Sequence, residues 1–208
     1  MKSTTHLHAI TAKIDKADLY NLNWLKERKW TTVFCCGNHE NFNVLNRLPT
    51  VHLFGNDVGV VADNVYHLRR GRVYNIAGRT IFTFGGALSI DKAFRKEGIS
   101  WWPEEYPNEE EIDRAHEEIR KCGGVVDYVI SHTCPKLANP FKMWEARAND
   151  PYHSYLKKDD IVMQYLQDFA DKLQFQMWYF GHMHVDANVK ERYVALCNKV
   201  IRLGDYHT

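Results

Sequence analysis

The sequence lacks any apolar run of about 18 residues, the length that a transmembrane helix needs, so we expect no membrane span. Its first residues, Met1 to His6, lack an apolar stretch, so no signal peptide is visible. It also lacks an excess of charge, since 27 Lys and Arg residues against 26 Asp and Glu residues give a net charge of +1. This balance offers no electrostatic argument for a nucleic-acid or membrane partner. With no Cys-x-x-Cys pair and an odd total of 5 cysteines, we expect reduced thiols in a cytoplasmic protein without a zinc knuckle.

The composition is that of an ordinary folded domain. Among 208 residues, 45% are apolar and 25% are charged, which excludes intrinsic disorder as the main state. The length and the lack of internal repeats predict a single domain over residues 1–208, in which residues 1–18 are poorly defined. Histidine is abundant, with 11 residues, and the positions of these histidines carry the functional argument.

Hydrophobic spacing and turn residues predict alternating helices and strands, which is typical of an α/β protein. We expect helices over 18–29, 41–47, 108–121 and 159–172; Asp18 caps the first, which has Leu19, Leu22 and Leu25 on one face, and Asn108 caps the third. We expect strands over 30–36, 65–68, 72–76, 80–85, 125–130, 176–180, 190–196 and 198–203, with hairpin turns at Gly71 and Gly78. Residues 86–107 read as an irregular insertion.

Three of the predicted strands end in loops that carry asparagine or histidine. The loops hold Asn38 and His39, then His132, and then His182 and His184. Because ligands of open α/β sheets bind outside the carboxyl ends of the strands, we expect these loops to meet. Imidazole nitrogens and an amide oxygen suit zinc, iron or manganese. Taken alone, such an Asn or His is more often a residue that suits a turn or a histidine packed in the fold. Three such loops together favour a metal site.

These loops lie within three longer motifs. The motifs are Gly37-Asn38-His39-Glu40, Ser131-His132 and Gly181-His182-Met183-His184. In this order they resemble the G-N-H-[ED], single-histidine and G-H-x-H motifs of the calcineurin-like metallophosphoesterase superfamily. The resemblance is strongest to small bacterial and phage members, and it extends from about Leu22 to Leu203.

The resemblance implies an αββα sandwich of two mixed β-sheets, with a two-metal centre at the strand ends. It implies that Asn38, His132 and His182 ligate one ion, that His184 ligates the other, and that His39 acts on the leaving group or steadies the phosphoryl oxygens. The implied ions are Mn²⁺, Fe²⁺ or Zn²⁺, which clamp the phosphate and generate a hydroxide nucleophile. The implied reaction is hydrolysis of a phosphomonoester or phosphodiester, with nucleic acid only as a substrate and no membrane partner.

The chain departs from the superfamily pattern before Gly37. The D-x-H and G-D motifs, the second of which supplies the aspartate that bridges both metals, have no counterpart there, so we expect an N-terminally shortened fold. A few residues could stand in weakly for the missing motifs: Asp15, Asp18, the pair His6 and His8, and the segment Gly204-Asp205-Tyr206-His207. For the first four, a solvated N-terminal segment is the commoner explanation, and for the last, a chance match. Without the bridging carboxylate less negative charge would separate two cations, so we expect at most one weakly held ion.

Missing strands would also leave a sheet edge unpaired, so a partner chain or an oligomer is expected to cover the incomplete sheet. The main hypotheses are a metal-dependent phosphoesterase, active or impaired, and a non-catalytic binding protein on the same fold. A single-zinc module is the third, against which the lack of clustered Cys and His weighs. Trp101-Trp102 could stack on a substrate base and Arg69-Arg70 with Arg72 could hold phosphate, although packing and solvated hairpin positions are their commoner roles.

Overall fold

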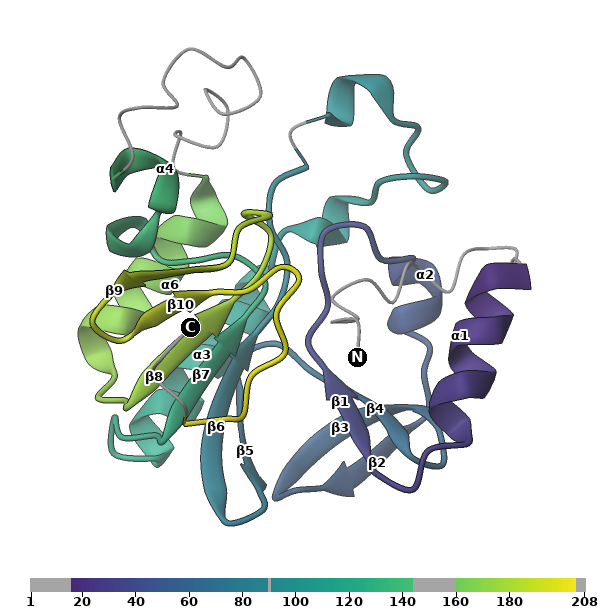
Figure 1. Ribbon diagram of the computed structural model, residues 1–208, viewed down its shortest axis with the longest axis horizontal. Coiled ribbons are helices and arrows are strands. Elements are labelled where there is room, and N and C mark those ends of the chain that lie inside the picture. Colours follow the sequence, from purple (N-terminus) through teal and green to yellow (C-terminus); the bar gives the residue numbers. More distant parts are fainter. Residues whose placement is uncertain (1–15, 90, 144–159, 205–208) are drawn as a thin grey trace.

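The computed structural model describes residues 16–89, 91–143 and 160–204, which form two β-sheets with helices on their outer sides (Figure 1). The first sheet has the strand order β1-β4-β3-β2, and the second has the order β5-β6-β7-β8-β10-β9. In each sheet, parallel and antiparallel pairs occur together. The predicted α/β fold with two mixed sheets is therefore confirmed.

The elements have the following bounds. The first sheet consists of β1 (Thr32–Phe34), β2 (Thr50–Leu53), β3 (Asn56–Ala62) and β4 (Val65–Leu68). The second consists of β5 (Arg72–Ile76), β6 (Arg79–Phe84), β7 (Tyr128–Ser131), β8 (Met177–Phe180), β9 (Ala187–Lys190) and β10 (Tyr193–Ala195). The helices are α1 (Lys16–Lys26), α2 (Phe42–Leu45), α3 (Glu109–Lys121), α4 (Pro140–Met143) and α6 (Ile161–Lys172). Within the described ranges, no helix combines the length and the apolar character that crossing a bilayer requires.

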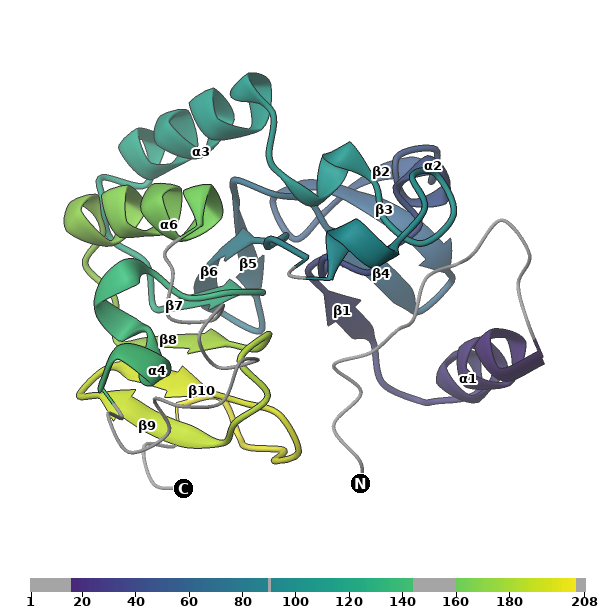
Figure 2. The same ribbon diagram turned by 90° about the horizontal axis from the view of Figure 1, so that it is seen from above.

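The main hydrophobic core lies between the six-stranded sheet and the helix pair α3 and α6 (Figure 2). Strands β6, β7 and β8 run parallel through the middle of this sheet. Phe82 and Phe84 of β6 point to the helix side, where their ring centroids lie 5.7 and 5.1 Å from that of Phe169 on α6. Parallel strands covered on both faces read as continuous apolar runs, and this explains why they were recognised in the sequence.

The two helices of this layer begin where the sequence predicts. Asn108 accepts a hydrogen bond from the Glu111 N–H, and the Glu111 carboxylate accepts one from the Asn108 N–H, which completes a capping box. Asp160 caps α6 by accepting from the Met163 N–H at 2.8 Å. Its other oxygen accepts from the Leu88 N–H at 3.2 Å, so the same carboxylate ties the loop after β6 to the helix.

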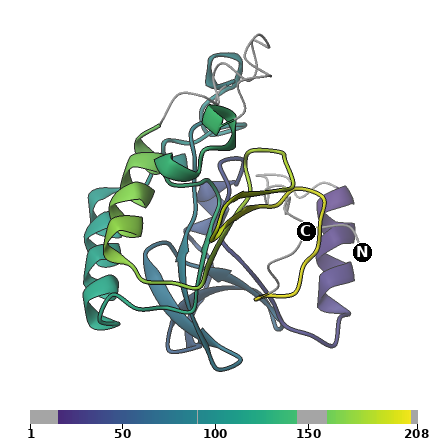
Figure 3. The ribbon, with the colours of Figure 1, turned by 60° about the vertical axis from the view of Figure 1, so that its left-hand side comes forward.

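On the far side of the molecule, α1 and α2 lie next to the four-stranded sheet (Figure 3). Phe42 of α2 packs in a cluster with Cys36 and Trp102, so packing is the observed role of Trp102. The predicted apolar face of α1 is only partly correct, because Leu25 is 4% exposed whereas Leu19 is 48% exposed. The helix is held at its end, where the Asn64 amide donates to the Leu25 carbonyl, while the Tyr20 side chain is exposed.

Two hairpins have two-residue turns with positive φ angles, but the sequence predicted only one of them. The predicted turn at Gly78 is confirmed, with φ angles of 53° at Ala77 and 75° at Gly78. The β2–β3 hairpin was missed, although Phe54 and Gly55 form the same kind of turn with φ angles of 57° and 82°. The predicted hairpin at Gly71 is wrong, because β4 and β5 belong to different sheets and residues 69–71 cross between them.

The predicted strands at the carboxyl end are displaced. The strand expected over 190–196 includes the turn between β9 and β10, and no strand forms over 198–203. The Asp186 carboxylate explains the second difference, because it accepts from the N–H groups of Cys197 at 2.7 Å, Asn198 at 3.0 Å and Lys199 at 3.1 Å. These donors are satisfied by a side chain and need no neighbouring strand.

Strand β1 lies at the edge of the first sheet and is shorter than the predicted 30–36 segment. It pairs in parallel with β4, and within the described residues no strand pairs with its other edge. Beside it, a cavity of about 210 Å³ is lined by residues of β1, β7 and β8, including Val33, Ile130 and Tyr179. From the sequence, we expect the missing strands to leave one sheet edge unpaired. The free edge of β1, next to a cavity between the sheets, is such an edge among the described residues.

Candidate metal centre

The loops after β1, β7 and β8 meet at the carboxyl ends of these strands, as predicted. The Gly181 N–H donates to the His132 carbonyl at 2.9 Å, which joins the second loop to the third. A methyl group on Gly37 would lie 3.1 Å from Cε1 of His132, so the missing side chain lets the first loop approach the second. The three motifs therefore form one cluster, although they come from both sheets.

Asn38 is the centre of this cluster and is 3% exposed. Its Oδ1 accepts a hydrogen bond from Nε2 of His132 at 2.8 Å. Its Nδ2 donates to the Ser89 hydroxyl at 2.9 Å and to Nε2 of His39 at 3.3 Å. The amide is thus fixed with its nitrogen toward Ser89 and its oxygen toward His132, and an amide oxygen is the atom that a cation would take.

His182 and His184 lie in a tight loop rather than on a strand. The Met183 N–H donates to the Gly181 carbonyl at 2.7 Å, and His182 and His184 have φ angles of 63° and 52°. Positive φ angles in residues other than glycine cost of order 1–3 kcal/mol and cluster at functional sites. The Met183 side chain is 2% exposed and joins the main core, which anchors the loop.

The His182 ring lies next to the His132 ring, with centroids 5.1 Å apart. Burial, with smaller contributions from the nearby His184 and His39, lowers the pKa of His182 to about 3. His182 is therefore a neutral imidazole at neutral pH, which is the form that binds a metal. His39 lies near enough to Asp91 to lower the pKa of that carboxyl, behind the larger effect of the Arg95 hydrogen bond.

Ser89 is a site residue that the sequence reasoning missed. It lies in the loop after β6, which is parallel to β7 and ends at the same side of the sheet. Ser89 is 2% exposed, and its hydroxyl accepts from Asn38. Glu105 is fully buried beside it: burial raises the pKa of Glu105, and a hydrogen bond with Ser89 opposes this rise. The strand-end position of Ser89 was the one signal that could have identified it.

Glu40 is the carboxylate that the first motif itself supplies. It accepts a hydrogen bond from the Gly37 N–H at 3.1 Å, so it closes its own loop. Burial raises its pKa to about 7, against the opposing effects of the Gly37 hydrogen bond and the charge of Arg70. Glu40 lines the 210 Å³ cavity together with His132, on the side of the loop that faces between the sheets.

The donor atoms partly fit a divalent cation. Oδ1 of Asn38 and Nε2 of His132 face each other, and the neutral His182 ring lies alongside, so an amide oxygen and two imidazoles are in place. Within residues 16–89, 91–143 and 160–204, however, no three His, Cys, Asp or Glu side chains form a group that could hold a metal. The described residues therefore supply a neutral, incomplete ligand set.

The residues that could stand in for the missing aspartate fall outside the part of the chain that the structure describes. Asp15, Asp205, His6 and His8 lie outside the described residues. Asp18 belongs to α1, and its side chain is also outside the described part.

Comparison with known proteins gives two findings. The family described as calcineurin-like phosphoesterase matches residues 12–186. The lariat debranching enzyme of Schizosaccharomyces pombe is 27% identical over 161 residues, which cover 74% of this chain and 33% of that protein. The chain thus aligns with about a third of the length of this curated relative.

Proposed function

Since the chain belongs to the calcineurin-like phosphoesterase family, we propose that it is a metal-dependent hydrolase of a phosphomonoester or phosphodiester. The observation that carries this proposal is the contact between Oδ1 of Asn38 and Nε2 of His132, with the neutral His182 ring beside them. These are three ligands that the motifs imply for one cation, and they come together from three separate loops.

Each residue has a task in this proposal. Asn38, His132 and His182 hold one divalent ion, Mn²⁺, Fe²⁺ or Zn²⁺, and His184 contributes to a second position. The ion, when bound, supplies polarisation of the phosphoryl group and activation of water. Ser89 keeps the Asn38 amide in the orientation that presents its oxygen. His39, next to the same amide, steadies the phosphoryl oxygens or serves the leaving group.

The four proposed ligands are one amide and three imidazoles, none of which carries a negative charge, so a dication at this site would have no compensating charge from them. We propose that a carboxylate from outside the described residues completes the centre. The open edge of β1 is where an additional strand would bring such a carboxylate closest to Asn38, because the loop that holds Asn38 begins at the end of this strand. A partner chain or a second copy that covers this edge is part of the same proposal.

The incomplete ligand set favours one alternative. A chain of this fold without the carboxylate would bind a phosphoester or a single ion without turnover. The small net charge of this chain gives no electrostatic field that would attract nucleic acid as a substrate.

The test is hydrolysis of p-nitrophenyl phosphate and bis(p-nitrophenyl) phosphate after loading with Mn²⁺, Fe²⁺ or Zn²⁺ in turn. We expect turnover with at least one ion, and a loss of about 100-fold or more in the His182→Ala variant. The His52→Ala variant is the matched control, because His52 is an exposed residue of β2. Metal binding without turnover would favour the non-catalytic alternative. The absence of both metal binding and turnover would contradict both hypotheses.

A further inference from the structure

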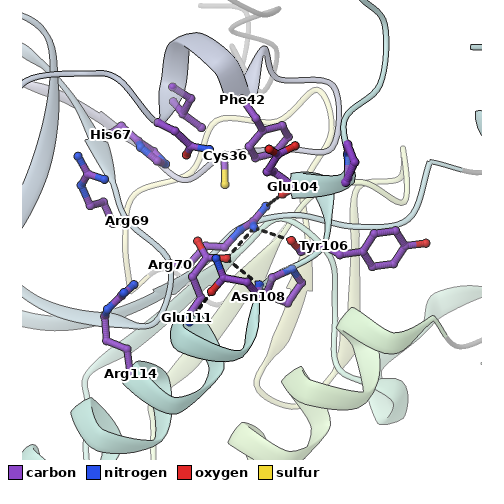
Figure 4. Close-up of a pocket in the computed structure, with 14 residues that line it drawn as sticks. Cys36, Phe42, His67, Arg69, Arg70, Glu104, Tyr106, Asn108, Glu111 and Arg114 are labelled. Atoms are coloured by element: carbon purple, nitrogen blue, oxygen red, sulfur yellow. Dashed lines mark hydrogen bonds and ion pairs between the residues drawn. The ribbon is translucent and has the colours of Figure 1, made fainter. Parts of the chain in front are cut away.

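A second cavity, of about 500 Å³, is distinct from the 210 Å³ cavity beside the candidate metal centre (Figure 4). It is formed by α2, the end of β4 with residues 69–70, the segment 103–108 and the start of α3. Cys36 lines this cavity, whereas its neighbour Cys35 lines the 210 Å³ one. None of the five proposed site residues lines it, so it is a separate site.

His67 is the unusual residue of this cavity. It lies on β4, is 5% exposed, and both of its ring nitrogens are buried without a hydrogen-bond partner. Its ring packs on Phe34 at a centroid distance of 5.3 Å, which fixes its position. An unsatisfied buried polar group costs about 1–3 kcal/mol, so two such atoms on one side chain call for an explanation. A ligand in the cavity would supply the missing partners.

Arg69 and Arg114 give the cavity a positive charge that no ion pair among the described residues cancels. Arg69 donates to the Thr50 hydroxyl at 2.7 Å, but its Nε is buried without a partner. Among the described ion pairs, neither Arg69 nor Arg114 takes part in one, although both line the cavity. The third arginine differs, because Arg70 is paired with Glu111 at 3.1 Å and donates to the Glu104 carbonyl at 2.8 Å.

The negative groups at the cavity do not cancel this charge. The Glu111 carboxylate is taken by Arg70 and by the Asn108 N–H of the helix cap. Glu104 lines the cavity but is an exposed residue at its rim. In Figure 4, Arg69 and Arg114 lie on the same side of the drawn residues as His67, while Phe42 and Tyr106 lie on the other.

We propose that this cavity binds a small organic phosphate. Arg69 and Arg114 hold the phosphate oxygens, His67 donates one ring N–H to one of them, and the organic part rests against Tyr106. Guanidinium groups approaching from two elements suit an anion with several oxygens. A volume of about 500 Å³ exceeds what inorganic phosphate fills and is in the range of small-molecule sites, which fits an organic portion.

The test is calorimetric titration of the metal-free chain with adenosine 5′-monophosphate, inorganic phosphate and adenosine. We expect the monophosphate to bind, and the Arg69→Gln and Arg114→Gln variants to raise its Kd by roughly tenfold or more each. Arg79→Gln is the control, since Arg79 is a half-exposed arginine of β6 that lies outside the cavity. His182→Ala is the second control and should leave this Kd unchanged, whatever becomes of the proposed hydrolase activity.

The result that would overturn the proposal is a monophosphate Kd that the two arginine variants leave unchanged. Loss of binding in His182→Ala alone would place the anion at the metal centre instead and would equally overturn it. If adenosine bound as tightly as the monophosphate, the cavity would not recognise phosphate. If inorganic phosphate bound as tightly, the organic part of the ligand would contribute nothing to the affinity, which contradicts that part of the proposal. Should an arginine variant fail to fold, the side-chain ¹⁵N resonances of His67 in the unmodified chain decide, because they shift only if the ligand enters this cavity.

Discussion

Nε2 of His132 donates to Oδ1 of Asn38 at 2.8 Å, across a sequence separation of 94 residues. The two atoms in this hydrogen bond are the ones that a metal ion would take from these side chains. Binding an ion therefore requires the His132 proton to leave Nε2 for Nδ1, and the bond between the two residues to open. Hydrogen bonds between the side chains hold Asn38 in the cluster, so the stability of the fold and the affinity for metal are separate quantities that can be measured independently.

His132→Ala should remove metal binding while the chain stays folded. We expect the Kd for Mn²⁺ to rise at least tenfold, because one of three clustered donors is lost. We expect the free energy of unfolding to fall by only about 1–3 kcal/mol, because the buried Oδ1 of Asn38 loses its donor while the rest of the fold keeps its contacts. Calorimetric titration with Mn²⁺ measures the Kd. His52→Ala, on the exposed face of β2, should bind as the parent does, and equal affinities in all three proteins would contradict the assignment of the cluster.

Ser89→Ala tests whether the orientation of Asn38 matters. Without the Ser89 hydroxyl the Asn38 amide loses the acceptor that fixes its Nδ2, and removal of such supporting groups typically weakens metal affinity by about 10–100-fold. The same titration measures this. Ser100→Ala is a suitable control, because the Ser100 hydroxyl bonds to the Lys96 backbone in the insertion away from the cluster. An unchanged affinity in Ser89→Ala would show that His132 and His39 suffice to hold the Asn38 amide.

The elements that the sequence predicted well are those whose defining residues, such as a helix cap or an apolar run, lie close to one another along the chain. The predicted cap Asn108 bonds to Glu111 only three residues further on, and the apolar runs of β7 and β8 end directly before the motifs that carry His132 and His182. The loops that carry Asn38, His132 and His182 could therefore be placed at strand ends. That they meet followed from a general property of α/β sheets rather than from any one residue.

The features that were missed depend on partners distant in the sequence or on uncommon turn residues. Phe54 adopts a positive φ angle that bulky residues rarely take, so nothing marked the β2–β3 hairpin. Asp186 binds backbone donors more than ten residues further on, which prevents the strand expected at 198–203. Ser89 is 51 residues from Asn38, and no local pattern connects them.

Gly85→Ala should destabilise the fold strongly. A methyl group there would overlap both the carbonyl oxygen and the Sγ of Cys36, so the segment that leads from β1 into the first motif would have to move. We expect a loss of about 2–3 kcal/mol in the free energy of unfolding, measured with denaturant. Gly181→Ala is the matched control, because its methyl group would meet nothing closer than 3.6 Å. Equal losses in the two variants would show that the Cys36 segment can shift at little cost.

The pH dependence of stability should carry a contribution from His67. Burial, with the charges of Arg69 and Arg70, lowers its pKa to about 3, while in the unfolded chain it returns to about 6.5. As pH falls below 6.5, the unfolded chain therefore takes up a proton that the folded chain refuses, and stability falls. The slope from one such group is at most about 1.4 kcal/mol per pH unit.

Chemical denaturation of the parent and of His67→Gln between pH 6.5 and 5 isolates this contribution. Other groups that titrate in the same window, including Glu40 and His182, are present in both proteins and cancel in the difference. We expect the stability of the parent to fall more steeply with decreasing pH than that of the variant, so that the two curves converge. Parallel curves would mean that His67 is hydrated or paired in solution, and the cavity around it would then no longer hold two unsatisfied nitrogens for a ligand to bind.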